Sequence, residues 1–188
     1  MQVEKTALPG VLKITPRRFG DARGWFTESW NGPAFDAATG TTIEWVQDNH
    51  SFSAQKGTVR GLHYQSPPRA QDKLVRVTQG AVRDVAVDAR RGSPSYGRWV
   101  AVDLTAEGGE QLLIPKGFLH GFATLTPDVH FLYKCSDVYA PDCDGAVAWD
   151  DADLGIDWGV EDATVSAKDA AAPRFSDWTS PFAHEDFR

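Results

Sequence analysis

The sequence predicts an all-β fold, either an antiparallel β-sandwich or a jelly-roll barrel with a few short helices. Short segments in which apolar and polar residues alternate follow one another along most of the chain, and no long helical period interrupts them. The 17 glycines and 11 prolines lie in small groups between these segments, as turns require. With 188 residues, of which 41% are hydrophobic, the chain fits one domain spanning residues 1–188.

Each expected element follows from its local pattern. Alternation and flanking turn residues predict strands within 11–15, 25–30, 43–53, 58–65, 73–80, 81–92, 99–109, 111–115, 114–122 and 129–139. Residues 33–39 are expected to form a short helix, because Pro33 suits the first helical position and Gly40 follows the last one. From Trp149 onward no period is visible, and this irregular tail is expected to fold across the mouth of the barrel.

Side-chain alternation assigns faces within two of these strands, and polarity limits the position of part of a third. In the strand at 25–30, Glu28 shares a face with Phe26 and Trp30. The polar run 47–50 belongs on a surface or facing a polar cavity, because such side chains are costly in an apolar core. In the strand at 58–65, Val59, Gly61, His63 and Gln65 lie on one side, so Arg60 joins His63 only if the strand kinks at Gly61.

The segment 56–76 is strongly basic within an acidic protein. It carries five basic residues against one acidic residue, whereas the whole chain has a net charge of −7. Such a strip is either a solvated face balanced by neighbouring carboxylates or a pocket for an anion such as a phosphate. His63 lies between Arg60 and Lys73, and a titratable base flanked by fixed cations suits removal of a proton from carbon with stabilisation of the resulting anion.

Composition excludes several classes of function. The acidic balance, with a sequence pI of about 5.1, argues against a nucleic-acid backbone as partner. The first residues lack the apolar core of a signal peptide and no apolar run approaches the roughly 20 residues that span a bilayer, so we expect a cytoplasmic protein without a membrane partner. Cys135 and Cys143 are expected to be free thiols in that compartment.

Three long motifs resemble one family of sugar-nucleotide enzymes. They are RGLHYQSPPRAQDKLVRVTQGAVRDVAVDARRGSPSYGRW, IPKGFLHGF and YKCSDVYAP, and the similarity extends from residues 19–30 to residues 166–169. On these motifs the chain resembles the dTDP-4-dehydrorhamnose 3,5-epimerases of the RmlC-like cupin family. The resemblance implies a cupin-type jelly roll and a cofactor-independent isomerase that converts dTDP-4-dehydro-6-deoxy-D-glucose to dTDP-4-dehydro-L-rhamnose in dTDP-L-rhamnose biosynthesis.

The resemblance also implies roles for individual residues. His63 matches the catalytic base, Asp169 the carboxylate that orients it, Tyr133 the proton donor and Lys73 a cation near the keto group. The positions that match substrate-binding residues of the family are Arg23, Glu28, Gln47, Asp48, Asn49, Arg60, Lys73, His120, Tyr139, Asp144 and Lys168.

The same resemblance implies a homodimer that exchanges N-terminal strands, so that the partner subunit supplies Arg23 and Glu28. Tyr139 matches an aromatic residue that stacks on thymine. Asp144 departs from the family pattern, which usually has glutamate at this position, and its shorter side chain puts that ligand contact in doubt.

The proposed chemistry also follows from the residue types. Removing the hydrogen next to a ketone produces an enolate, whose oxygen needs a positive partner such as Lys73. A histidine with a reference pKa of about 6.5 is mostly neutral near pH 7 and accepts the proton. A phenol such as that of Tyr133 delivers a proton to the other face, which inverts the carbon. No redox cofactor is required.

Three alternatives compete with this interpretation. A metal cupin usually pairs two histidines in an HxH unit, whereas this chain has His63, Tyr64 and Gln65 there, which leaves His63 and His120 as the plausible imidazole ligands. We therefore expect no metal. The second alternative is a related enzyme that inverts one carbon, at position 3 or 5, or moves the keto group, and the third is a non-catalytic binding module for sugar nucleotides.

Overall fold

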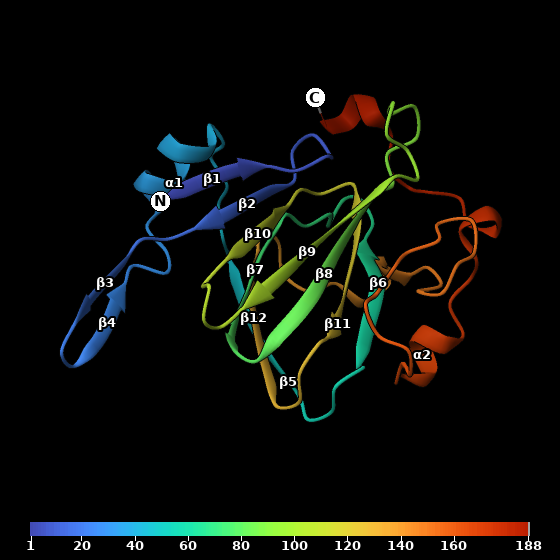
Figure 1. Cartoon of the computed structure of the whole chain (residues 1–188). Helices are drawn as coiled ribbons and strands as arrows, with labels where there is room; N and C mark the ends of the chain where they lie inside the picture. The colour runs from blue at the N-terminus through green and yellow to red at the C-terminus, as the bar shows by residue number, and fades with distance from the viewer. Residues whose placement is uncertain (188) are drawn as a thin grey trace.

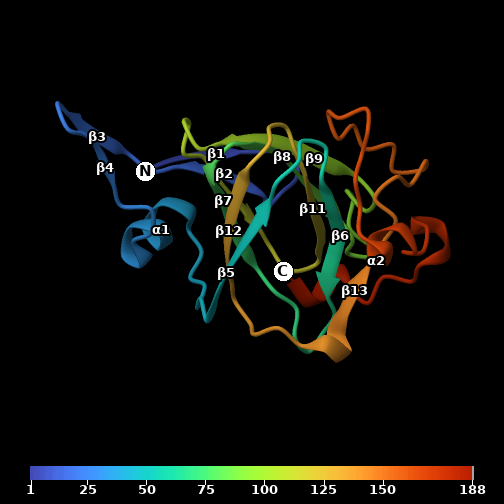
Figure 2. The same ribbon diagram turned by 90° about the horizontal axis from the view of Figure 1, so that it is seen from below.

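The computed structural model describes residues 1–187, and two antiparallel sheets form its body (Figure 1). The six-stranded sheet has the order β1 (Gln2–Lys5), β2 (Leu12–Thr15), β10 (Gln111–Ile114), β7 (Lys73–Gln79), β12 (Val129–Cys135) and β5 (Gln47–Ser53). The five-stranded sheet has the order β13 (Asp144–Ala146), β6 (Val59–Gln65), β11 (Phe118–Thr124), β8 (Ala81–Asp88) and β9 (Trp99–Thr105). Figure 2 shows β5, β12 and β7 on one side of an open barrel and β6 and β11 on the other.

An apolar layer holds the two sheets together. Val75 and Phe131 from the six-stranded sheet pack with Ala86, Leu104 and Phe122 from the five-stranded sheet, and all five side chains are at most 4% exposed. The rings of Phe122 and Phe131 stack with centroids 4.0 Å apart. This layer confirms the predicted cupin-type jelly roll, in which alternate residues of facing strands form the core.

The predicted helix is present and covers the outer face of the six-stranded sheet. Helix α1 (Gly32–Thr39) begins after Asn31, whose side-chain oxygen accepts a hydrogen bond from the Ala34 amide, and ends at Gly40 with a φ of 72°. Its buried Phe35 packs against Trp30 and Trp45. The helix therefore screens one end of this face from solvent.

The tail beyond residue 146 covers the outer face of the five-stranded sheet rather than only the barrel mouth. Val147, Leu154, Trp158 and Phe182 are buried there against the outward side chains of β6, β8 and β11. The short helices of the C-terminal half are η1 (Pro141–Cys143), α2 (Ala167–Ala170), η2 (Phe175–Asp177) and η3 (His184–Phe187). Of these, α2 lies beside β6 and brings a carboxylate to it.

A two-stranded hairpin projects from the body (Figures 1 and 2). It consists of β3 (Arg18–Asp21) and β4 (Gly24–Thr27). Three of its aromatic side chains are half or more exposed, Phe19 at 50%, Trp25 at 59% and Phe26 at 66%. The strand predicted over 25–30 ends at Thr27, so Glu28 and Trp30 do not belong to a strand. The predicted shared face of Glu28 with Phe26 and Trp30 is therefore wrong.

Strand β6 is irregular at Gly61, the position where the sequence allowed a kink. His63 pairs with His120 of β11 and Arg60 pairs with Phe122, so three residues along β6 correspond to two along β11. The register between the two strands therefore shifts by one residue. Gly61 has a φ of 139°, and a Cβ at this position would lie 2.6 Å from the Cα of Gly121. Only glycine fits this close approach of two backbones.

Other boundaries differ from the sequence prediction. The strand expected over 43–53 begins at Gln47, and β1, β3 and β13 were not predicted. Cys135 and Cys143 are free thiols, as predicted. Among residues 1–187, no helix is long and apolar enough to cross a membrane.

Candidate active site

A cavity of about 430 Å³ opens where β5, β7 and β12 of one sheet face β6 and β13 of the other. Eight of the predicted site residues line it, namely Gln47, Asn49, His63, Lys73, Tyr133, Tyr139, Asp144 and Lys168. They come from both sheets, from the loop after β12 and from α2, so the folded barrel assembles residues that are up to 121 positions apart. The cavity is therefore the candidate active site.

His63 and Asp169 form a hydrogen-bonded pair in this cavity. Ser166 caps α2 by accepting a hydrogen bond from the Asp169 amide, and the Asp169 carboxylate, which is 4% exposed, then reaches β6. Its Oδ1 lies 2.7 Å from His63 Nε2. A carboxylate bonded to Nε2–H keeps the proton on that nitrogen, so the lone pair of the neutral ring is on Nδ1.

The environment of His63 favours the neutral ring. Burial lowers the pKa of His63 below 6.5, and the hydrogen bond and charge of Asp169 oppose this effect. The charges of Lys73 and Lys168 lower the pKa further. A neutral imidazole near pH 7 with a carboxylate behind it suits a general base, because the carboxylate stabilises the imidazolium that forms.

Lys73 and Tyr133 complete the set of candidate catalytic groups in the cavity. They project from the neighbouring strands β7 and β12 of the six-stranded sheet, whereas His63 projects from the five-stranded sheet. Burial lowers the pKa of the Lys73 ammonium and raises the pKa of the Tyr133 phenol, and the charge of Arg60 opposes the shift of Tyr133. Tyr133 is therefore a neutral hydrogen donor near pH 7.

The rim of the cavity carries an exposed aromatic ring and an ion pair. The Tyr139 hydroxyl lies 3.3 Å from Asp144 Oδ2, and Lys168 Nζ donates to the same carboxylate oxygen. Tyr139 is 57% exposed, so its ring is available to a flat ligand. The hydrogen bond to Asp144 raises the pKa of Lys168, which keeps this ammonium charged. The shorter carboxylate of Asp144 thus reaches both Tyr139 and Lys168.

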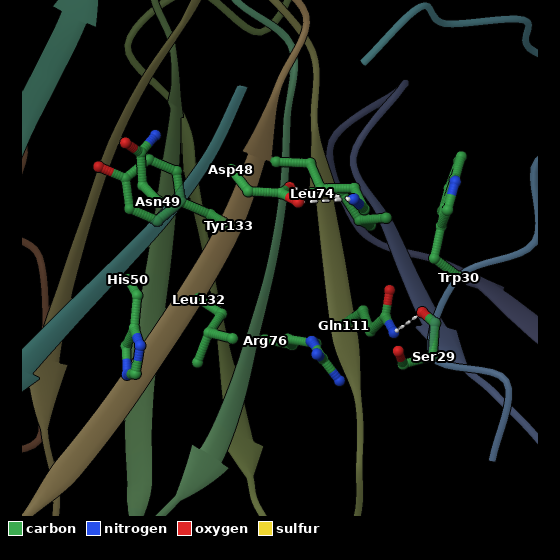
Figure 3. Close-up of a pocket in the computed structure, with 11 residues that line it drawn as sticks. Ser29, Trp30, Asp48, Asn49, His50, Leu74, Arg76, Gln111, Leu132 and Tyr133 are labelled. Atoms are coloured by element: carbon green, nitrogen blue, oxygen red, sulfur yellow. Dashed lines mark hydrogen bonds and ion pairs between the residues drawn. The ribbon is translucent and has the colours of Figure 1, made fainter. Parts of the chain in front are cut away.

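The polar run on β5 is divided between two faces of the sheet. Gln47 and Asn49 face the cavity, whereas the side chain of Asp48 lies 3.0 Å from Lys134 Nζ on the outer face. Figure 3 shows a second cavity, of about 360 Å³, which contacts Asp48, Arg76 and Gln111 on this outer side. Asn49 and Tyr133 line this second cavity as well as the first. Within one subunit, Asp48 therefore lies on the opposite face of the sheet from Gln47 and Asn49, because consecutive strand residues point to opposite faces.

His120 and Arg60 lie near the cavity without lining it. His120 is opposite His63 in the pairing of β6 with β11, but it is 7% exposed and its Nε2 lies 3.0 Å from Asp84. The Arg60 guanidinium is bonded to the Ser53 hydroxyl and to the Phe52 carbonyl. The kink in β6 is present, yet it does not bring Arg60 into the cavity with His63.

Arg23 and Glu28 lie outside the cavity. Arg23 is at the hairpin turn with a side chain that is 90% exposed, and it pairs with Asp21 at 2.6 Å. Glu28 accepts a hydrogen bond from Asn31, next to helix α1. Within one subunit, neither residue reaches His63.

The two imidazoles that a metal site would need have other partners. His63 pairs with Asp169 and His120 pairs with Asp84. Among residues 1–187, no three His, Cys, Asp or Glu side chains group as a metal site requires.

Four further residues line the cavity that the sequence did not single out as functional. They are Tyr64, Gln65, Gln71 and Cys135. Strand alternation contained the signal for two of them, because Gln65 shares a face with His63 and Cys135 shares one with Tyr133. Gln71 lies in the turn before β7, where no periodic pattern assigns a direction.

Comparison with known proteins agrees with this geometry. The curated dTDP-4-dehydrorhamnose 3,5-epimerase of Salmonella typhimurium is 50% identical over 174 residues, which cover 92% of this chain and 94% of that protein. The crystal structure of the 3,5-epimerase RmlC from Legionella pneumophila, in complex with dTDP-4-keto-L-rhamnose, is 45% identical with a TM-score of 0.89 and covers 93% of both chains.

A further solved structure has a narrower activity. ChmJ, a 3'-monoepimerase from Streptomyces bikiniensis in complex with dTDP-quinovose, is 34% identical with a TM-score of 0.85, covering 91% of this chain and 86% of that one. The family model described as dTDP-4-dehydrorhamnose 3,5-epimerase matches residues 5–177. With this match and these identities, the chain belongs to the dTDP-4-dehydrorhamnose 3,5-epimerase family of isomerases.

Proposed function

We propose that this chain, acting as one catalytic domain, epimerises C3 and C5 of dTDP-4-dehydro-6-deoxy-D-glucose to give dTDP-4-dehydro-L-rhamnose. The observation that carries the proposal is the shared cavity of His63 and Tyr133, because the base comes from one sheet and the phenol from the facing sheet. A sugar ring held between the sheets meets a proton acceptor on one face and a proton donor on the other. Such an arrangement inverts a carbon.

The first half of the reaction is removal of a proton. His63 Nδ1 accepts the hydrogen from the carbon next to the keto group, and the C–H electron pair moves into the enolate. Asp169, 2.7 Å from Nε2, stabilises the imidazolium, and the ammonium of Lys73 stabilises the enolate oxygen. Positioned general-base catalysis contributes about 10²–10⁴-fold to the rate.

The second half is delivery of a proton to the other face. Tyr133 donates its hydroxyl hydrogen to carbon as the enolate returns to the ketone, and solvent restores both groups to their starting protonation states. The same steps at the carbons on both sides of one keto group give double epimerisation. Only protons move, so the reaction needs no redox cofactor.

The nucleotide is proposed to bind at the rim. The Tyr139 ring stacks on the thymine, and Lys168 neutralises the diphosphate, to which cationic side chains are well suited. Arg60 joins Lys168 only if its guanidinium leaves Ser53 and Phe52. Gln47 and Asn49 offer amide groups to the ligand. Asp144 holds Lys168 in place through their ion pair.

We also propose a homodimer in which the hairpins are exchanged. Phe19, Trp25 and Phe26 would otherwise leave three large rings in water on a projecting hairpin, and a partner subunit that covers them removes that cost. Arg23 and Glu28 would then lie near the cavity of the partner. In such a dimer, Asp48 on the outer face of the sheet would meet the exchanged segment.

Isotope labelling tests the proposed reaction. The enzyme is incubated in heavy water with dTDP-4-dehydro-6-deoxy-D-glucose, and the label is located by NMR. Deuterium at both C3 and C5 with inversion at both is the expected result. The 34% identity to a 3'-monoepimerase makes single inversion the second candidate, and label at one carbon only would establish it. Binding of dTDP without any exchange would identify a binding module.

A further inference from the structure

Residues 137–140 form a short loop that carries Tyr139 at the rim of the cavity, and glutamine side chains bind the backbone of every residue in it. Gln71 Nε2 donates to the Asp137 carbonyl at 2.8 Å and Gln65 Nε2 donates to the Val138 carbonyl at 3.2 Å. The Tyr139 amide donates to Gln47 Oε1 at 2.9 Å and the Ala140 amide donates to Gln65 Oε1 at 2.8 Å. We call Gln47, Gln65 and Gln71 the glutamine clamp.

An amide side chain is the group that this loop requires. The loop presents two carbonyl acceptors and two N–H donors, and an uncharged amide satisfies both kinds at once. Gln65 is the centre of the clamp, because it binds both Val138 and Ala140 and also donates to the Arg69 carbonyl at 2.8 Å. Gln65 is 5% exposed, so its side-chain amide is largely shielded from water and depends on these partners.

The position of the Tyr139 ring depends on this backbone. The ring is 57% exposed, and its hydroxyl makes one hydrogen bond of 3.3 Å to Asp144. Packing alone therefore does not hold the ring, whereas its own amide and both neighbouring residues are bound by the clamp.

The segments flanking the loop are fixed by other bonds. Ser136 donates from its amide to the Asp72 carbonyl at 3.1 Å and from its hydroxyl to Asp72 Oδ2 at 2.9 Å. On the other side, the Cys143 amide donates to the Ala140 carbonyl at 3.0 Å. Loss of the Gln65 amide therefore leaves the Val138 carbonyl and the Ala140 amide without these partners, while both ends of the loop stay attached.

We propose that Gln65 is a positioning residue for the nucleotide, which acts by fixing the loop 137–140 so that Tyr139 is preorganised for the base. This inference rests on the proposed stacking role of Tyr139. A ring already held in its bound conformation loses less conformational entropy when the ligand arrives, so preorganisation appears as affinity. The His63–Asp169 pair is bonded separately from the clamp, so Gln65 contributes to binding of the nucleotide rather than to proton transfer.

The test compares dTDP binding by calorimetry and steady-state kinetics for Gln65→Met, which keeps the length of the side chain and removes its amide. Roughly tenfold weaker dTDP binding is expected, from the buried loop groups left without partners. KM should rise by a similar factor, with kcat within about threefold of the wild-type value. Gln71→Met, which removes one bond, should have a smaller effect. Gln79→Met, at an exposed position at the end of β7, should have none.

A double-mutant cycle with Tyr139→Ala decides whether Gln65 acts through the ring. Once the ring is absent, Gln65→Met should weaken dTDP binding less than twofold further. Any of three results would overturn the inference: losses of dTDP affinity that add fully in the double variant, unchanged dTDP affinity in Gln65→Met, or a fall in kcat that matches the rise in KM. If Tyr139→Ala alone binds dTDP as tightly as the wild type, the proposed stacking role fails instead. Should Gln65→Met not fold, Gln65→Glu, which keeps the acceptor for Ala140 and loses both donors, is judged by the same criteria.

Discussion

The buried carboxylate behind His63 gives the sharpest prediction. Asp169→Asn keeps the shape of the side chain and removes its charge. Asp169 is 4% exposed and lies 2.7 Å from Nε2, and a hydrogen bond to a charged group in such a setting contributes about 1.5–3 kcal/mol. If the imidazolium is nearly formed in the transition state, this loss alone slows the reaction by about 10–10²-fold.

Loss of the correct tautomer adds to this effect. The amide that replaces the carboxylate in Asp169→Asn can turn its NH₂ toward Nε2, which would move the ring proton to Nδ1, the nitrogen that must accept hydrogen from the sugar. Together the two effects predict a fall in kcat of about 10²–10³-fold.

The pH profile provides an independent measurement. Burial already lowers the pKa of His63 below 6.5, and Asp169 raises it, so removing the charge moves the pKa lower still. The base works in its neutral form, so the acidic limb of kcat/KM lies below pH 6.5 in the wild type and should shift to lower pH in Asp169→Asn. Asp150→Asn, which removes an exposed carboxylate with the same change in net charge, serves as the control. A variant with kcat within threefold of wild type and an unmoved acidic limb would refute the pairing.

Three further predictions follow from other parts of the structure. Tyr133→Phe should still exchange the substrate hydrogen with solvent deuterium while inversion slows by about 10²–10⁴-fold, as NMR of the sugar would show; loss of exchange as well would contradict the division of roles. Asp88→Asn should cost about 3–5 kcal/mol in urea unfolding, since Asp88 is fully buried and its loss leaves Arg90, 2.8 Å away, without its partner. Burial alone would raise the pKa of Asp88, but hydrogen bonds from Arg90, Ser93 and Ser95 lower it from 3.8 to about 2. This lowered pKa stabilises the folded wild type by about 2 kcal/mol above pH 3.8, and the contribution is lost as the pH falls toward 2. If Asp88→Asn lost stability in acid to the same extent as the wild type, Asp88 would not be the source of this pH dependence. Phe26→Asp on the hairpin should halve the mass measured by sedimentation and raise KM, whereas an unchanged mass would exclude the hairpin from the dimer contact.

Local patterns in the sequence predicted those features that depend on neighbouring residues. Pro33 and Gly40 set the ends of α1, and alternation put Tyr133 on the apolar inner face of β12 with Val129 and Phe131. Gly61 marked the position where β6 could kink, because glycine allows a kink at little cost. These inferences require only the period of a strand and the conformational freedom of glycine.

Pairings between distant segments could not be predicted from such patterns. The run Gln47–His50 is polar at every position, so alternation alone could not decide that Gln47 and Asn49 face inward and Asp48 outward. Likewise, nothing near His120 in the sequence indicates that Asp84 binds its ring. Ser166 and Asp169 had the spacing of a helix cap, a signal that was available and was not used.

The irregular tail was the largest gap in the prediction. Its apolar residues lack a period because each fills a separate gap over the outer face of the five-stranded sheet, as Val147, Leu154 and Trp158 do. A segment that takes its shape from a surface already formed carries no repeat of its own. Asp169 lies in this tail and meets His63 only in the finished fold. Its role therefore follows from the family resemblance and not from the period of its own segment.

Replacement of the proposed base tests the account most directly. His63→Ala is mixed with dTDP-4-dehydro-6-deoxy-D-glucose in heavy water, and exchange at C3 and C5 is followed by NMR while dTDP affinity is measured by calorimetry. The expected result is loss of exchange at both carbons with dTDP bound about as tightly as by the wild type, because Tyr139 and Lys168 lie at the rim and remain intact. Exchange at a rate near that of the wild type would show that another group removes the proton.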